Sequence, residues 1–257
     1  MRFAHHKVTS LPLSDFVDLM WHAQGYVQPH PSERILPTGS MDLVLSLDAS
    51  HGDTVSGAHS EFMILDTSRP LSLVGVRFKP GGGFPFFGLP AGELQNSRIP
   101  LETLWGGEAR RLREQLLEAR TAAERFHLLE QALERRLLGV PARDPAVLYA
   151  LAAFTDPLRT PNVASVVERI GVTQRRFIAA FRDGVGLTPK VFCRITRFRR
   201  VIGTLQKAPE VDWAELALDC GYFDQAHFIH DFRDFAGVSP SAYLRQRTSA
   251  NHVRVMD

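Results

Sequence analysis

The stretch FIHDFRDFAGVSP (residues 228–240) repeats an earlier stretch, FIAAFRDGVGLTP (residues 177–189), at an offset of 51 residues. Phe, Ile, Phe, Arg, Asp, Gly and Pro coincide between the two. Upstream, at an offset of 50, VVERIG (166–171) and LALDCG (216–221) share an apolar pattern that ends in Gly. Two helices joined by a short turn that often holds a glycine form a helix-turn-helix unit. The sequence therefore predicts that this unit occurs twice.

A long helix is expected between the two predicted units, which span about residues 160–186 and 210–237. The connecting segment is PKVFCRITRFRRVIGTLQK (189–207), and its apolar residues recur at helical spacing. These residues are Phe192, Ile195, Phe198, Val201, Ile202 and Leu205. Because they face the core, we expect Arg194, Arg197 and Arg200 on the outer face, with Arg194 and Arg197 turned toward DNA phosphate.

Charge is concentrated in the first unit and the linker helix. The chain has a formal net charge of only +2, but residues 169–200 hold nine basic residues and one acidic residue, Asp183. Such a cluster on a nearly neutral chain is typical of a surface that binds a polyanion. A solvated, arginine-rich helix would give the same pattern, and charge alone does not separate the two interpretations.

Two histidines of the second unit, His227 and His230, lie three residues apart, a few positions after Cys220. They could ligate zinc, lie exposed without a role, or belong to a polar recognition face. At the offset of 51, His227 corresponds to Arg176 and His230 to Ala179, so the first unit offers no equivalent ligands. Cys220 corresponds to Ile170, a core position. We therefore expect no metal and favour the recognition face, because His, Gln and Arg can hydrogen-bond base edges and phosphates.

The segment ALDCGYFDQAHFIHDFRDFAGVSPSAYLR (217–245) resembles the signature of the AraC/XylS family of transcription regulators. The resemblance extends over about residues 145–247, with one departure at Val167, where such units usually have a small alanine. It implies two helix-turn-helix subdomains that enter adjacent major grooves, which agrees with the spacing expected of two DNA readers. We assign DNA contacts to Gln174, Arg175, Arg176, Ala179, Arg182, Arg194, Arg197, Gln225, Ala226, His227, His230 and Arg233.

The first 140 residues have a different organisation. DLVLSLD (42–48), EFMILD (61–66) and LSLVGVRF (71–78) read as strands, and KPGGGFPFFGLP (79–90) reads as a loop. The stretches 35–47 and 74–94 resemble a variable sensor domain that some family members carry. That resemblance implies a cupin-like β-barrel, which can hold one small ligand.

The expected fold class is therefore α+β multidomain. A barrel-like N-terminal domain with its own C-terminal helices precedes an all-helical domain. The boundary is placed in LGVPARDP (138–145), where Gly and Pro interrupt helical stretches, and gives domains 1–140 and 141–257.

An effector pocket is expected beside the glycine-rich loop. Its candidate residues are Trp21, Arg77, Phe78, Phe86 and Phe87, with Arg77 suited to a small anionic effector. The alternative is that the aromatic residues form barrel core and that Arg77 pairs with an internal carboxylate. No metal or cofactor is expected, because His22, His30, His51 and His59 are scattered along the chain.

Residues 107–138 are expected to form two helices. The second helix begins with a capping box of Thr121 and Glu124. Its apolar stripe, which contains Phe126 and Leu129, either packs on its own domain or forms a homodimer contact. The expected partners are double-stranded DNA, a small-molecule effector and, if the protein activates transcription, RNA polymerase.

The alternative function is a cupin-like enzyme or ligand-binding protein with an accessory helical domain. We expect no enzyme, because GxSxG, HExxH, P-loop and GxGxxG motifs are absent from the sequence. With no signal-peptide pattern and no apolar run of membrane-spanning length, a cytoplasmic location is expected. Cys193 and Cys220 are expected to be buried, reduced thiols.

Overall fold

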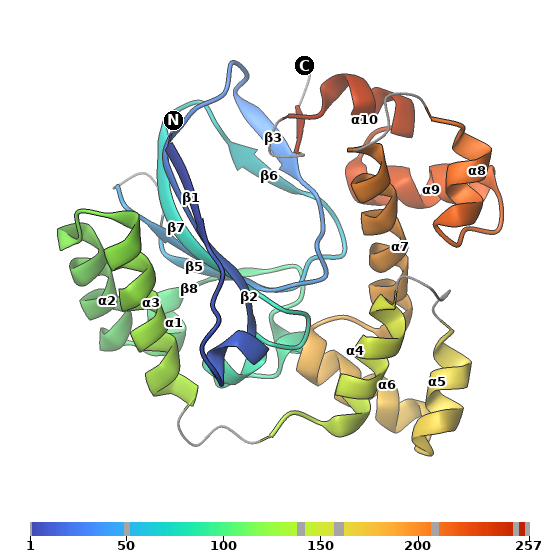
Figure 1. Ribbon diagram of the computed structural model, residues 1–257, viewed down its shortest axis with the longest axis horizontal. Helices are drawn as coiled ribbons and strands as arrows, with labels where there is room; N and C mark the ends of the chain where they lie inside the picture. The colour runs from blue at the N-terminus through green and yellow to red at the C-terminus, as the bar shows by residue number, and fades with distance from the viewer. Residues whose placement is uncertain are drawn as a thin grey trace.

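The computed structural model describes residues 2–48, 52–137, 142–156, 162–206, 211–248 and 252–254. The expected order is confirmed: a sheet-rich N-terminal part with helices of its own precedes an all-helical part (Figure 1). The first eight strands are β1 (Arg2–His6), β2 (Val17–Tyr26), β3 (Ser32–Ile35), β4 (Asp42–Ser46), β5 (Thr54–Ser56), β6 (Met63–Asp66), β7 (Leu71–Phe78) and β8 (Arg98–Pro100).

The strands form two sheets. The larger has the order β1-β2-β7-β4-β5-β8, and the smaller has the order β6-β3-β9, where β9 (Val253–Arg254) is the last described element. In β4 and β7, Leu43 pairs with Val76 and Leu45 with Val74, and all four side chains are buried. Because side chains alternate between the faces of a strand, this register gives the large sheet an apolar face.

Helices cover the large sheet on the side away from the helical part (Figure 1). They are α1 (Leu101–Trp105), α2 (Gly107–Glu118) and α3 (Ala122–Leu137). The capping box is confirmed: Glu124 N donates to Thr121 Oγ1 at 3.2 Å, and Thr121 N donates to the Glu124 carboxylate at 3.2 Å. The apolar stripe of α3, with Phe126 and Leu129 buried, packs into the core of its own sheet-rich part.

The glycine-rich loop contains one short 3₁₀ turn, η2 (Phe84–Phe86), and a second, η3 (Ala91–Glu93), follows it directly. Phe86 and Phe87 point into the core, where Phe86 stacks on Phe78 with ring centroids 5.1 Å apart. A Cβ atom added to Gly82 would lie 2.3 Å from the backbone oxygen of Phe16. Glycine is therefore required for the close approach of this loop to the segment before β2.

The helical part contains both predicted units. Its helices are α4 (Pro145–Thr155), α5 (Val163–Ile170), α6 (Gln174–Val185), α7 (Pro189–Leu205), α8 (Trp213–Asp219), α9 (Gln225–Ala236) and α10 (Pro240–Gln246). The long helix α7 is confirmed and connects the α5–α6 unit to the α8–α9 unit (Figure 1).

The repeated Gly-x-[Thr/Ser]-Pro motif ends one helix and starts the next. Gly186 follows α6 with φ 90° and Gly237 follows α9 with φ 68°, a left-handed conformation that glycine adopts without strain. Two residues later, Thr188 caps α7 by accepting from Val191 N, and Ser239 caps α10 in the same way. The sequence repeat is thus a repeat of helix boundaries.

Phenylalanine rings fill the core of the helical part. Phe177 and Phe181 lie on the buried face of α6, and Phe228 and Phe232 occupy the same positions in α9. All four side chains are buried. Cys193 and Cys220 are free and buried, as expected. Burial raises the pKa of the Cys193 thiol to about 12, so this thiol stays protonated at neutral pH.

The end of the chain returns to the sheet-rich part. Val253 pairs antiparallel with Arg34 of β3, and Val253 is fully buried in the core of the helical part. Residues 253–254 therefore pair with residues 33–34, a strand contact that crosses the expected domain boundary after residue 140. Within the described ranges, no helix combines the length and apolar character needed to cross a membrane.

Candidate nucleic-acid interface

The first turn of α6 presents a polar surface. Thr173 caps the helix by accepting from Arg176 N, and this places Gln174, Arg175 and Arg176 in the first turn, all exposed. Phe177 and Phe181 bury the opposite face. Neither Arg175 nor Arg176 forms an ion pair with any described residue. Two free guanidinium groups at the start of an exposed helix can donate to phosphate oxygens and to base edges.

The last turns of α6 have a different environment. Ala179 and Arg182 are exposed, but α6 packs against η3 of the sheet-rich part. A Cβ atom added to Gly92 would lie 2.9 Å from Arg182 Cγ, so the stem of Arg182 lies directly on η3. The first turn of α6 is therefore open, whereas its C-terminal half is partly covered.

Helix α9 repeats this arrangement with different side chains. Asp224 caps it by accepting from His227 N at 2.7 Å. The predicted contact residues on this helix are all exposed: Gln225, Ala226, His227, His230 and Arg233. The His230 side chain is 75% exposed, whereas His227 lies edge-on against Tyr222, with ring centroids 5.3 Å apart. His230 is therefore freer to reach a base than His227.

The expectation that Arg194 and Arg197 are free on the outer face of α7 is wrong. Arg194 donates to Asp231 from Nε at 3.0 Å and from Nη2 at 2.7 Å, and its Nη2 also lies 2.7 Å from Asp234. Arg197 Nη2 lies 3.6 Å from Asp231, and its guanidinium lies over the Tyr222 ring. The cause is the packing of α9 across α7, which brings its acidic residues onto the arginine face.

This network has an electrostatic consequence. The hydrogen bonds that Arg194 donates to Asp231 raise the pKa of its guanidinium, partial burial opposes this shift, and the hydrogen bond to Asp234 adds to it. The two carboxylates neutralise part of the basic concentration seen in the sequence. Arg194 and Arg197 of α7 thus differ from Arg175 and Arg176 of α6, which have no acidic partner among the described residues.

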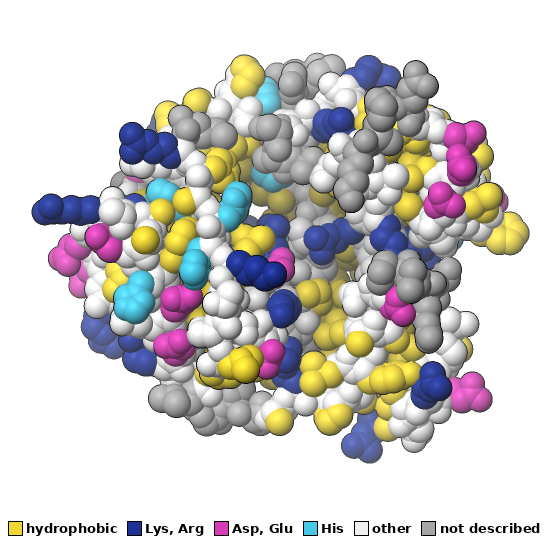
Figure 2. All heavy atoms as spheres, in the orientation of Figure 1, with side chains coloured by type: hydrophobic (Ala, Val, Ile, Leu, Met, Phe, Trp, Pro, Cys, Tyr) yellow, Lys and Arg dark blue, Asp and Glu magenta, His cyan; other side chains and the backbone are white. Residues whose placement is uncertain are grey.

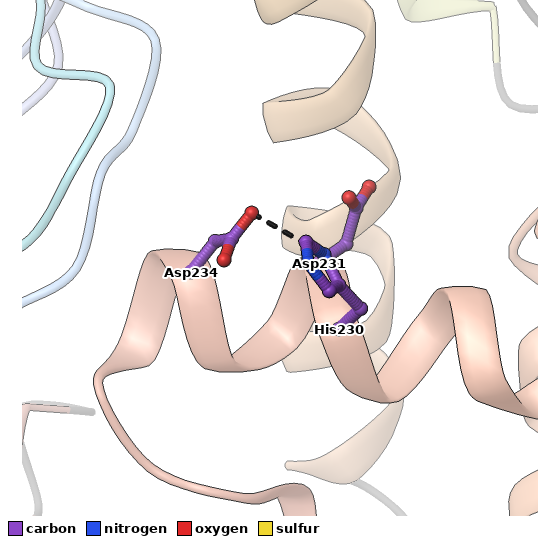
Figure 3. Close-up of side chains that lie close together, drawn as sticks. All are labelled: His230, Asp231 and Asp234. Carbon is purple, nitrogen blue, oxygen red and sulfur yellow. Dashed lines mark ion pairs between the residues drawn. The ribbon is translucent and has the colours of Figure 1, made fainter.

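Among the described residues, His230, Asp231 and Asp234 could offer three ligand atoms within 4.8 Å of one another (Figure 3). The His230 ring turns toward Asp234, with Nδ1 3.5 Å from the carboxylate, whereas Asp231 points toward α7. Both carboxylates already hold Arg194. Part of their charge is therefore balanced by this guanidinium, and Cys220 is buried away from this surface in the core.

The five residues expected in an effector pocket do not line one large cavity. Phe78, Phe86 and Phe87 are buried in the closed core. Trp21 packs against a separate small cluster on β2, and Arg77 pairs with Asp42, with Nε 3.0 Å from the carboxylate. Arg77 lines a small cavity of about 20 Å³. The alternative interpretation, core aromatics and an internally paired Arg77, describes these residues correctly.

A larger cavity, of about 530 Å³, lies beside the same loop. One wall is the loop around Phe84 and Leu89, and the other consists of α4 and α6, including Val147 and Ala180. In Figure 2 the molecule is hollowed between its sheet-rich and helical halves, with hydrophobic side chains toward the lower part of the hollow. The sequence identified the loop but not its partners, because α4 begins 55 residues after the end of the loop and α6 lies further still along the chain.

Two family models match the chain. Residues 7–100 match a domain of unknown function (DUF6597), and residues 166–246 match a helix-turn-helix domain. The second match covers both units found in the structure.

Among curated proteins, the chain is similar to an uncharacterized HTH-type transcriptional regulator of Haemophilus influenzae, with 23% identity over 130 residues. The match covers 47% of this chain and 42% of that protein, so the chain spans less than half the length of this relative.

Two solved structures are also similar. ToxT from Vibrio cholerae is 10% identical, with a TM-score of 0.44 and coverage of 95% of this chain and 97% of that one. A probable AraC family transcriptional regulator from Rhodopseudomonas palustris is 25% identical, with a TM-score of 0.35 and coverage of 40% and 96%.

Proposed function

We propose that the chain is a helix-turn-helix regulator of the AraC type and that it controls transcription by binding two adjacent major grooves of promoter or operator DNA. The observation that carries this proposal is the pair of capped helices, α6 and α9, whose first turns are polar and exposed. Two such readers on one face of DNA are separated by one helical turn, ~34 Å.

The two recognition helices, α6 and α9, contribute unequally to DNA affinity. Arg175 and Arg176 of α6 provide unpaired positive charge, whereas the acidic residues around α9 repel phosphate or bind Arg194. We infer that α6 supplies most of the affinity and that Gln225 and His230 of α9 adjust sequence preference. Arg194 and Arg197 then position α9 rather than contact phosphate.

The sheet-rich part is proposed to act as a sensor for a small molecule, and the protein to act as a regulator rather than an enzyme. Residues 107–138 are proposed as the contact of a homodimer through their outer surface, where Leu117 is 48% exposed. RNA polymerase is the further partner if the protein activates transcription. A regulator of this type works in the cytoplasm, where the DNA is.

Selection from a random library of duplex DNA with the purified full chain tests this function. We expect recovery of two half-sites one helical turn apart, with footprints on one face of the duplex. The double variant Arg175→Ala and Arg176→Ala is the negative control: it should fold normally but lose DNA binding. Recovery of no preferred sequence at low salt would reject the proposed function.

A further inference from the structure

The two helix-turn-helix units differ at one position in their packing. In the second unit, Phe235 of α9 is buried and packs on Phe198 of α7, with ring centroids 5.2 Å apart. At the offset of 51, the counterpart of Phe235 is Gly184 of α6. The first unit therefore lacks the ring that fills this position in the second.

The helices that precede the two units, α4 and α7, can be compared in the same way. Helix α4 buries Val147, Ala150 and Phe154, and α7 buries Phe198, Val201 and Leu205, so the two helices match at the same offset of 51. At this offset the counterpart of Phe198 is Val147 of α4, which a Cβ atom at Gly184 would meet at 3.5 Å. Both Val147 and Gly184 line the cavity of about 530 Å³. The cavity therefore lies where the second unit has a pair of phenylalanine rings.

The charged residues follow the same correspondence. In the second unit Arg194 Nη2 lies 2.7 Å from the Asp234 carboxylate. The counterparts of Arg194 and Asp234 are Arg143 and Asp183, and both line the cavity. The first unit thus has both charged residues but not the ion pair between them. Among the described residues the Asp183 side chain forms no hydrogen bond or ion pair, and Asp144, the other carboxylate of the lining, caps α4 by accepting from Ala146 N.

The remaining lining is apolar, with Phe84, Pro85 and Leu89 from the loop facing Val147 and Leu151 from α4. A volume of about 530 Å³ falls in the usual range for small-molecule sites, roughly 300–1,000 Å³. Arg143 also borders the cavity, but its guanidinium lies over the Phe16 ring and donates to the Asp15 backbone oxygen. The lining charges are therefore two carboxylates and one guanidinium that is held elsewhere.

We propose that this cavity binds a small aromatic molecule that carries a cationic group, such as an ammonium or amidinium. The ring occupies the space beside Gly184 and Val147, and the cation lies near Asp183 and Asp144. The ligand thereby supplies the ring that Phe235 provides in the second unit, and it places beside Asp183 the positive charge that Arg194 places beside Asp234.

Its regulatory consequence rests on the proposed function. Helix α6 forms one wall of the cavity and also carries the first DNA reader, while the loop from the sensor forms the other wall. A ligand that favours one packing of these walls must change DNA affinity, and DNA must change ligand affinity by the same factor.

Calorimetric titration of the full chain tests the chemistry with three probes on one carbon skeleton: 4-phenylbutylamine, 4-phenylbutanol and 4-phenylbutyrate. We expect the amine to bind most tightly, the alcohol more weakly and the acid most weakly. Equal binding of all three, preference for the acid, or no binding of the amine would overturn the proposal.

Gly184→Phe tests the location, because it installs the side chain found at the matching position of the second unit. A Cβ atom at Gly184 meets Val147 Cγ1 at 3.5 Å, an ordinary contact. We expect amine binding to fall at least about tenfold. The matched control is Gly203→Phe on α7, where a Cβ atom meets nothing within 4 Å, and binding should be unchanged.

A second pair of variants keeps the test valid if Gly184→Phe does not fold. Leu148 belongs to the cavity lining, so Leu148→Trp should weaken binding of the amine. Tyr149 is its exposed neighbour outside the lining, so Tyr149→Trp should leave amine binding unchanged. Unchanged binding in Leu148→Trp would place the site elsewhere.

Asp183→Asn tests the charge. Amine affinity should fall roughly two- to fivefold, as expected for a partly exposed ion pair, with no change for the alcohol. Glu168→Gln, an exposed acid of α5 outside the lining, is the control. Equal loss for amine and alcohol would remove Asp183 from cation recognition.

Failure of this inference and failure of the proposed function give different results. A chain that selects DNA but does not bind the amine retains the function and loses the cavity site. A chain that binds the amine but selects no DNA retains the site and loses the function.

Discussion

Arg194 of α7 holds Asp231 of α9 through two hydrogen bonds to a single carboxylate oxygen, from Nε at 3.0 Å and Nη2 at 2.7 Å. Asp231 is only 3% exposed at its side chain, so an arginine on the linker helix neutralises a carboxylate buried behind the second recognition helix. This contact fixes how α9 crosses α7.

Arg194→Ala should therefore act on stability. Removing one partner leaves the buried Asp231 carboxylate without its main donor, and we expect a loss of about 1–3 kcal/mol in unfolding free energy. Urea unfolding of the full chain measures this loss. Asp234→Asn, which removes the outer and more exposed partner, should cost less. If Arg194→Ala were as stable as the parent chain but flattened the salt dependence of DNA binding, Arg194 would be a phosphate contact after all.

Arg175→Ala should have the opposite profile. Arg175 is exposed on the first turn of α6 and has no ion-pair partner among the described residues, so its loss should leave the unfolding free energy unchanged. A base-contacting arginine is worth about 1–3 kcal/mol of DNA affinity and reads one base pair. Competition binding over a sequence library measures both effects. An equal loss on all sequences would instead indicate a phosphate contact.

His230→Ala and His227→Ala should differ in sequence preference. The His230 side chain is exposed although its ring contacts Asp234, whereas the His227 ring packs on Tyr222. Library selections with each variant should therefore show relaxed preference for His230→Ala and an unchanged motif for His227→Ala. The same motif in both variants would exclude His230 from base contact.

Glu33 should make stability depend on pH. Burial raises the pKa of its carboxyl, but hydrogen bonds from His252, Tyr26 and His30 outweigh burial and lower the pKa to about 2. A depressed acid pKa stabilises the folded state above the unfolded value of 4.5, and this contribution is lost as pH falls from there toward 2. The contribution at neutral pH is about 2–3 kcal/mol.

Glu33→Gln should thus lower the urea midpoint at pH 7 and reduce the difference between pH 7 and pH 3. Glu61→Gln, at an exposed position, is the control and should retain the full pH dependence. An unaltered pH profile in Glu33→Gln would show that the carboxylate does not fasten residue 252 to β3.

Residues 141–257 should fold alone, because the repeat supplies its own aromatic core. The fragment should show helical circular dichroism and bind duplex DNA at low salt. It should be less stable than the same region in the full chain, because β9 loses its pairing with β3. An unfolded fragment would contradict a boundary at residue 140.

The sequence by itself determined the repeat, the helix boundaries and the polar first turns of α6 and α9. These features are local: Thr173 and Asp224 cap helices through donors three residues away, and Gly186 and Gly237 end them through their own backbone conformation. Helical periodicity likewise placed Phe177 and Phe228 in the core without knowledge of their partners.

Only the tertiary structure decided which face of α7 is free and where a ligand can lie. Arg194 and Asp231 are 37 residues apart, and Glu33 and His252 are 219 apart. No periodic pattern encodes such pairs, because they form when separately folded helices and sheets pack together. The cavity beside Gly184 arises for the same reason: an absent side chain becomes a site only when α4 and the loop around Phe84 enclose it.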